Sequence, residues 1–179
     1  NLDPFIVTMN HSTRLEALLF PILFAFERRG KLVRFIADWN FALIPGIVVY
    51  VWFFGAAVLV QIALASVTAL AAEAAMLKLR GKPIMMFLAD GSALVTAWLI
   101  ALTFPPLAPW WLTVVGVLTA IVIAKHLYGG LGQNLFNPAM VAYVLLLVSF
   151  PVQMTSWLPP SSIAAYDIGF ADAASVIFT

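Results

Sequence analysis

The sequence predicts an all-α integral membrane protein, a multi-span bundle of short and broken helices. Hydrophobic residues make up 64% of the 179 residues and charged residues only 9%, whereas soluble domains carry about 25% charged residues. The mean hydropathy of +1.04 supports the same conclusion. Apolar segments follow one another along the chain, and glycine or proline interrupts several of them, a pattern typical of discontinuous membrane helices.

Residues 1–34 form an N-terminal segment that is not expected to cross the membrane. Its apolar run, 15–26, would cover about 18 Å as a helix, well short of a hydrocarbon core of about 30 Å. We expect an interfacial or protein-buried helix there, with a span extended back through residues 5–7 as the alternative. The chain opens on Asn1 and lacks the basic start of a signal peptide, so we also expect a fragment of a longer protein.

The membrane domain is expected from residue 35 to residue 150, with about five spans. Pro45 and Gly46 interrupt the first span, and the last span is too short to cross a bilayer alone. Residues 151–179 are expected to form an extracytoplasmic segment. The expected spans are 35–54, 56–77, 92–104, 110–124 and 139–150.

The second span carries polar side chains, which usually face other helices when they lie in a membrane span. Ser66 and Glu73 lie on one helix face, and Gln61 and Thr68 share another. Glu73 has two interpretations. Its carboxylate could extend towards Lys78 and the interface, or it could bind a coupling ion or carry a proton.

Two later spans begin at polar interruptions of similar composition. Residues 90–92 precede the third span, and the glycine-containing stretch 125–139 precedes the fifth, where Asn137-Pro138 is typical of a helix cap followed by proline. Free N–H groups at such helix starts suit an anionic group or a polar ring edge. The candidate residues near a flavin or an ion path are Asp90, Ser92, Gly129, Gly130, Asn134 and Asn137.

Two other features allow a functional and a structural interpretation. His126 could shuttle protons, but next to Lys125 at a membrane border it is more often a solvated interfacial residue. The pair Trp110-Trp111 could stack on a flavin, but an aromatic belt at the interface is the more common role.

Charge placement predicts the orientation of the chain. All nine Lys and Arg fall at Arg14, in 28–34, in 78–82 and at Lys125. Counting spans places the last three locations on one side of the membrane, which the positive-inside rule makes cytoplasmic. The segment 151–179, which contains no Lys or Arg, then begins on the other side.

The sequence lacks the motifs of several classes of metal-binding proteins and soluble enzymes. There is no cysteine for a thiolate-bound metal or iron–sulfur cluster, no metal-ligand spacing, no nucleophile elbow and no phosphate-binding loop. We assign no catalytic residue and no metal ligand, and we expect no nucleic-acid partner. A membrane scaffold with broken helices remains, suited to ion passage or to holding a cofactor.

The motifs closely resemble the NqrB/RnfD family of membrane subunits, in particular its RnfD branch from the bacterial Rnf electron-transport complex. The strongest matches are the runs 124–139 and 149–159, and the resemblance is dense from about residue 45 onward. The first roughly forty residues do not resemble the usual family start. Supporting matches are Trp52 to Gly55, Leu77 to Arg80, Asp90 with Ser92-Ala93-Leu94, and Pro105 to Trp111.

The resemblance implies a subunit of an inner-membrane complex that passes electrons between ferredoxin and NAD while moving Na⁺ or H⁺. It implies two inverted repeats in a urea-transporter-like fold, of which this chain would be one. It also implies partner iron–sulfur, flavin and membrane subunits, and an FMN bound covalently to a threonine outside the cytoplasm. That threonine lies downstream of the matched region, and Thr179 lacks its motif.

The leading hypothesis is therefore a subunit of a redox-driven, ion-translocating complex that helps to form an FMN site. A passive channel or small-solute transporter is one alternative, because broken helices can line a pore. A membrane anchor without a redox role is another. In that case the polar breaks would serve only packing.

Overall fold

The computed structural model describes residues 39–128, 134, 136–160 and 169–179. They belong to one compact unit, Ile36–Thr179. All regular secondary structure in the described ranges is helical, which confirms the all-α prediction. In chain order the helices are Trp39–Phe54, α2 (Ala57–Leu79), α3 (Ile84–Leu88), α4 (Ser92–Thr103), α5 (Trp110–Leu118), η1 (Thr119–His126), α6 (Pro138–Ser149), α7 (Pro151–Thr155) and α8 (Phe170–Phe178).

The apolar segments of the sequence become helices with bounds close to those expected. The run 110–124 forms two pieces, because α5 continues without a break into the π-helix η1, which extends to His126. The sequence patterns did not indicate α3 or the helices α7 and α8 within 151–179. The expected helix at 15–26 lies outside the described residues.

One helix of the described part, α2, is long and apolar enough to cross a membrane by length and composition. Four shorter apolar helices accompany it: Trp39–Phe54, Ser92–Thr103, Trp110–His126 and Pro138–Ser149. Their shortness agrees with the expectation of broken helices. The number of spans and the inverted repeat remain predictions.

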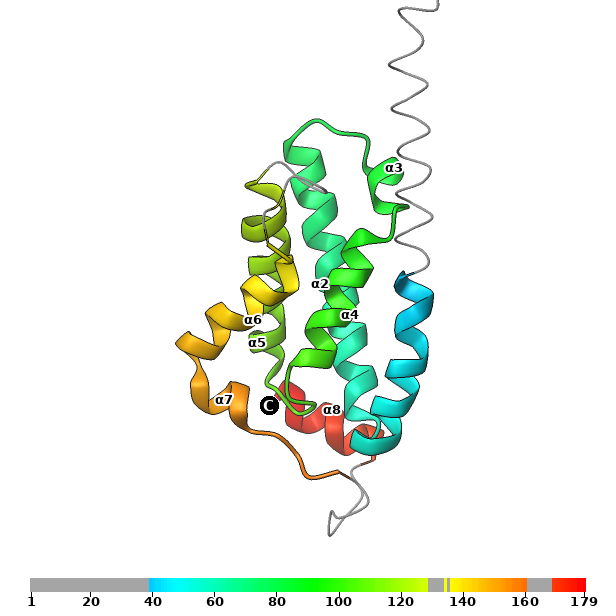
Figure 1. Ribbon diagram of the computed structural model, residues 1–179, viewed down its shortest axis with the longest axis vertical. Helices are drawn as coiled ribbons and strands as arrows, with labels where there is room; N and C mark the ends of the chain where they lie inside the picture. Colours follow the sequence, from blue (N-terminus) through cyan, green and yellow to red (C-terminus); the bar gives the residue numbers. More distant parts are fainter. Residues whose placement is uncertain (1–38, 129–133, 135, 161–168) are drawn as a thin grey trace, which may run out of the picture. The chain divides into compact units, whose positions relative to one another are not determined.

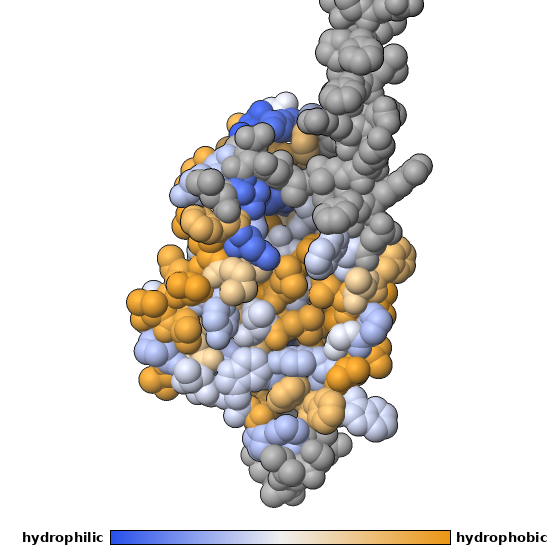
Figure 2. All heavy atoms as spheres, in the orientation of Figure 1, coloured by the Kyte–Doolittle hydropathy of each residue, from blue (hydrophilic) through white to orange (hydrophobic). Residues whose placement is uncertain are grey.

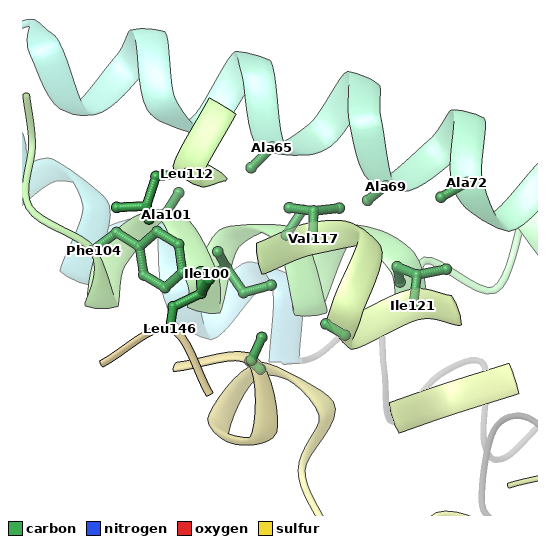
Figure 3. Close-up of a cluster of buried hydrophobic side chains, with 14 of the residues drawn as sticks. Ala65, Ala69, Ala72, Ile100, Ala101, Phe104, Leu112, Val117, Ile121 and Leu146 are labelled. Carbon is green, nitrogen blue, oxygen red and sulfur yellow. The ribbon is translucent and has the colours of Figure 1, made fainter. Parts of the chain in front are cut away.

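Helix α2 packs along α4 and α5 (Figure 1), and α6 packs against η1, α4 and α5. Small residues make the close approach of α2 and α4 geometrically feasible, as in other membrane helix pairs. Alanines of α2 face the buried cluster shown in Figure 3, among larger side chains from the other helices. The buried alanines are Ala65, Ala69 and Ala72 on α2 and Ala93, Ala97 and Ala101 on α4.

Gly116 on α5 shows how tightly this cluster is packed. A Cβ added there would lie 2.7 Å from the ring of Phe104 and 3.0 Å from Leu146, and both of these side chains are fully buried. Glycine is therefore required by close approach at this position. The contact joins α5 to the end of α4 and to α6.

Figure 2 shows large apolar areas on one face of the unit. Large hydrophobic side chains are exposed along the helix Trp39–Phe54 and along α6, among them Trp52 at 80% and Val148 at 78% exposure. An apolar exterior is what a lipid-facing protein presents. Hydrophilic residues gather in Figure 2 near the end of α2 that leads to α3.

Candidate functional site

A buried carboxylate lies close to the hydrophilic end of the bundle. Glu73, on α2, is only 3% exposed. Its Oε2 accepts a hydrogen bond of 2.9 Å from the ammonium of Lys125 on η1, which also donates at 2.8 Å to Oγ of Ser92 on α4. A single ammonium therefore connects three helices. Glu73, Lys125, Ser92 and the neighbouring His126 are called the Glu73 cluster below.

His126 brings a second nitrogen to the same carboxylate oxygen. Its Nε2 lies 3.1 Å from Oε2 of Glu73, but the contact lacks hydrogen-bond geometry and the buried Nε2 has no other partner among the described residues. The other ring nitrogen, Nδ1, lies 3.3 Å from the guanidinium of Arg80. Because arginine can only donate, a hydrogen bond between these two groups makes Nδ1 the acceptor, and on this basis we assign the ring proton to Nε2.

The π-helix η1 explains how two consecutive residues reach one carboxylate. The N–H of Leu127 donates to the carbonyl of Val122 at 3.1 Å, the i→i+5 bond that defines a π turn. The wider turn reduces the angle between successive side chains, so Lys125 and His126 are both buried on the side of α2. Such π segments occur frequently at functional sites.

The charges of the Glu73 cluster balance within it. Glu73 and Lys125 form an ion pair whose side chains are 4% and 3% exposed. A buried pair of this kind contributes little net stability, because desolvating two charges offsets their attraction, although breaking it is strongly destabilising. Charged residues inside membrane helices usually mark ion paths or proton relays.

These observations overturn two expectations. The interpretation that Glu73 extends to Lys78 or the interface is wrong, because the carboxylate is buried and pairs with Lys125 from another helix. The interpretation that His126 is solvated at the interface is also wrong, because it is only 5% exposed. The sequence signal was a carboxylate in the second expected span and a Lys-His pair at the end of the fourth.

Asp90 and Ser92 are buried at the start of α4, where the Asp90 carboxylate occupies one of the N–H groups. Oδ1 of Asp90 accepts the N–H of Ser92 at 2.8 Å, across Gly91, which adopts a φ of 74° that favours glycine. The expectation of a free N–H is wrong for Ser92, whose hydroxyl also binds Lys125. The negative charge of a carboxylate in this position would repel the negatively charged phosphate of a flavin.

The second predicted helix start is confirmed as a cap. Oδ1 of Asn137 accepts the N–H of Ala139 at 3.0 Å, with Pro138 at the first helical position of α6. The amide of Asn134 donates to the carbonyl of Phe136 at 2.8 Å. No hydrogen bond between described residues joins these asparagines to Asp90 or Ser92, and Gly129 and Gly130 lie outside the described residues.

In the pair Trp110-Trp111, the second tryptophan packs against another aromatic ring. Trp111 makes an edge contact with the ring of Phe150, with centroids 5.1 Å apart, while Trp110 is 43% exposed. Within the described ranges no group of three or more His, Cys, Asp or Glu is placed to hold a metal ion.

A second buried polar cluster lies nearer the N-terminal end of α2 and consists of Gln61, Thr113 and the carbonyl of Ala108. The amide of Gln61 donates to that carbonyl at 2.6 Å, and the Thr113 hydroxyl donates to Oε1 of Gln61 at 2.6 Å. Gln61 and Thr113 are both fully buried. We call these residues the Gln61 cluster; their hydrogen bonds join α2, α5 and the loop before α5.

Comparison with known proteins places the chain in a family. Residues 26–177 match the model of the NQR2, RnfD, RnfE family, so the match begins earlier than the sequence motifs indicated. A relative from Aeromonas hydrophila, named as a subunit of the ion-translocating oxidoreductase complex, is 72% identical over 138 residues, which are 77% of this chain and 39% of the relative. Proteins of the same name from Aeromonas salmonicida and Citrobacter koseri are 70% and 62% identical over the same shares.

The chain spans about two fifths of the length of these curated relatives, because the matched residues are 39% of each. The family match covers most of the chain and includes every helix of the Glu73 cluster. The chain belongs to the NQR2, RnfD, RnfE family.

Proposed function

We propose that this chain forms part of the membrane subunit of a redox-driven, ion-translocating complex. The names of its relatives support the proposal, since the proteins it resembles at up to 72% identity are called subunits of an ion-translocating oxidoreductase complex. Electron transfer between ferredoxin and NAD, coupled to Na⁺ or H⁺ movement across the bacterial inner membrane, is proposed from the motif resemblance. The partners are the other subunits of that complex.

Within this chain we assign ion coupling to the Glu73 cluster. The observation that carries the assignment is the buried Glu73–Lys125 ion pair, held between apolar helices where charges are expensive. A carboxylate there can bind a cation or a proton. Electron transfer elsewhere in the complex would change a charge and thereby shift the equilibrium between two ion accessibilities.

FMN is proposed as a cofactor of the full-length subunit on the resemblance alone. When bound, a flavin supplies one- and two-electron redox chemistry. The flavin or ion-path contacts expected at the two helix starts remain a proposal, although Asp90 and Asn137 each occupy one N–H group there. Fluorescence of the denatured full-length subunit, together with its intact mass, tests whether the flavin is covalent.

The decisive test of ion coupling is Glu73→Gln in the complete complex, reconstituted in proteoliposomes. We expect electron transfer to continue while redox-driven ion uptake and its cation dependence are lost, because the amide cannot carry the charge. Asp172→Asn is the matched control, since Asp172 is an exposed carboxylate on α8. Ion uptake with unaltered cation dependence in Glu73→Gln would contradict the assignment.

The same experiment separates the alternatives. A passive channel would move ions without electron transfer, and a membrane anchor would tolerate Glu73→Gln in both assays. A subunit that only anchors its neighbours needs helices that pack stably, and apolar contacts or fully hydrogen-bonded polar groups provide that. It does not need a buried, charged cluster in which the imidazole Nε2 makes no hydrogen bond to any described residue.

A further inference from the structure

The ammonium of Lys125 occupies the place that a small cation would take in the Glu73 cluster. Two oxygens from different helices, Oε2 of Glu73 and Oγ of Ser92, converge on Nζ at 2.9 and 2.8 Å. Oxygen ligands of this kind are those that hard cations prefer.

We propose that Lys125 is a tethered cation that competes with Na⁺ for the Glu73–Ser92 oxygens. The inference rests on the proposed function and deepens it. A buried carboxylate left without a counter-charge is strongly unfavourable, so Lys125 can leave Glu73 only when another cation arrives. Binding of the transported ion and departure of the lysine are thereby coupled, and an empty, uncompensated site is avoided.

A second observation points to a ligand at this site. Nε2 of His126 is buried, faces Oε2 at 3.1 Å and has no hydrogen-bond partner among the described residues. An unsatisfied buried donor usually needs an explanation. Here it would donate to the carboxylate or to water on a bound ion once the ammonium has withdrawn and Glu73 has adjusted.

The local backbone provides a route for that withdrawal. Lys125 lies in the last turn of η1, two positions before the exposed residue Leu127. Conversion of this π turn to an α turn would rotate the side chain away from α2, because the two helices differ in residues per turn. Such a rotation would move the ammonium towards the exposed end of η1, where Leu127 and Tyr128 lie.

The test is a Na⁺ titration of redox-driven uptake by the complete complex in proteoliposomes, with choline replacing Na⁺. Lys125→Met removes the competitor, so we expect the half-saturating Na⁺ concentration to fall by about tenfold or more, as when a competing state is abolished. Lys125→Arg keeps a charge that binds carboxylates through two nitrogens, and it should raise that concentration. Lys78→Met, at an exposed lysine of α2, should match the wild type.

The opposite signs of the two substitutions keep the inference falsifiable even if Lys125→Met does not assemble, because Lys125→Arg then decides alone. An unchanged half-saturating concentration in Lys125→Arg, or an unchanged or higher one in Lys125→Met, would overturn it. Wild-type uptake that does not depend on Na⁺ would also overturn it, yet would leave the proposed ion-translocating function intact. Failure of that function would show as electron transfer without any ion movement.

Discussion

Helix α2 carries two buried polar clusters that differ in kind. Gln61 and Glu73 lie about 18 Å apart along the helix, and each contacts the continuous helix Trp110–His126. The Gln61 cluster is neutral, and both functional groups of the glutamine side chain have a partner. The Glu73 cluster is charged, and one imidazole nitrogen in it makes no hydrogen bond to a described residue.

The difference separates a structural contact from a functional one. A fully satisfied neutral network fixes how helices pack and has no reason to change during a reaction cycle. A buried ion pair with an unsatisfied neighbour contributes little to stability, but it can exchange partners. The following predictions test this difference, beginning with the largest expected effect.

Lys125→Met should be strongly destabilising. It leaves the Glu73 carboxylate buried without a counter-charge, which typically costs about 3–5 kcal/mol. Thermal unfolding of the full-length subunit in detergent measures the loss. The double variant Glu73→Gln with Lys125→Met should recover most of it, and a double variant no more stable than Lys125→Met would show that the charges are not the cause.

Gln61→Leu should destabilise the fold by about 1–3 kcal/mol, because it leaves the Thr113 hydroxyl and the Ala108 carbonyl buried without their partner. Ion uptake per folded complex should stay at the wild-type level, in contrast to Glu73→Gln. Uptake and unfolding measured on the same preparations give both values. A specific loss of uptake in Gln61→Leu would remove the distinction between the clusters.

Asn137→Ala, outside both clusters, should cost about 1 kcal/mol, because it removes the side-chain cap of α6. We expect weaker assembly or flavin retention of the full-length subunit, read from its flavin content. Asn137→Asp, which keeps a capping oxygen, is the control. Unchanged flavin content and unchanged electron transfer in Asn137→Ala would contradict a role for this helix start.

Arg80→Met should have the smallest effect on stability, below about 1 kcal/mol, because its guanidinium is at the exposed end of α2. It should still alter the imidazole of His126, whose Nδ1 loses its donor. Nitrogen NMR of histidine-labelled protein should show the Nε2–H form in the wild type and a smaller share of it in the variant. A wild-type signal from the Nδ1–H form would contradict the assigned tautomer.

Local features of the sequence predicted the helices well. Apolar runs bounded by glycine, proline and charges correspond to α2, α4, α5 and α6. The cap at Asn137 followed from the Asn-Pro pair, because capping depends on residues next to each other in the chain. Burial of Gln61 and Glu73 against other helices also agreed with the expectation for polar residues in a span.

The partners of those residues were not predictable in the same way. Glu73 pairs with Lys125, 52 positions away, whereas reasoning from one span suggested the nearby Lys78. The π turn that aims Lys125 and His126 at one carboxylate follows from tertiary packing and has no recognised local signature. Asp90 filling an N–H at its own helix start depended on backbone geometry at Gly91.

The most direct test of the difference between the clusters is the number of ions moved per electron by the double variant Glu73→Gln with Lys125→Met. This variant removes both charges of the pair together, so its fold should resemble that of the wild type. We predict electron transfer close to the wild-type rate and ion uptake reduced to background. Ion uptake at the wild-type ratio in this variant would contradict the assignment of ion coupling to Glu73.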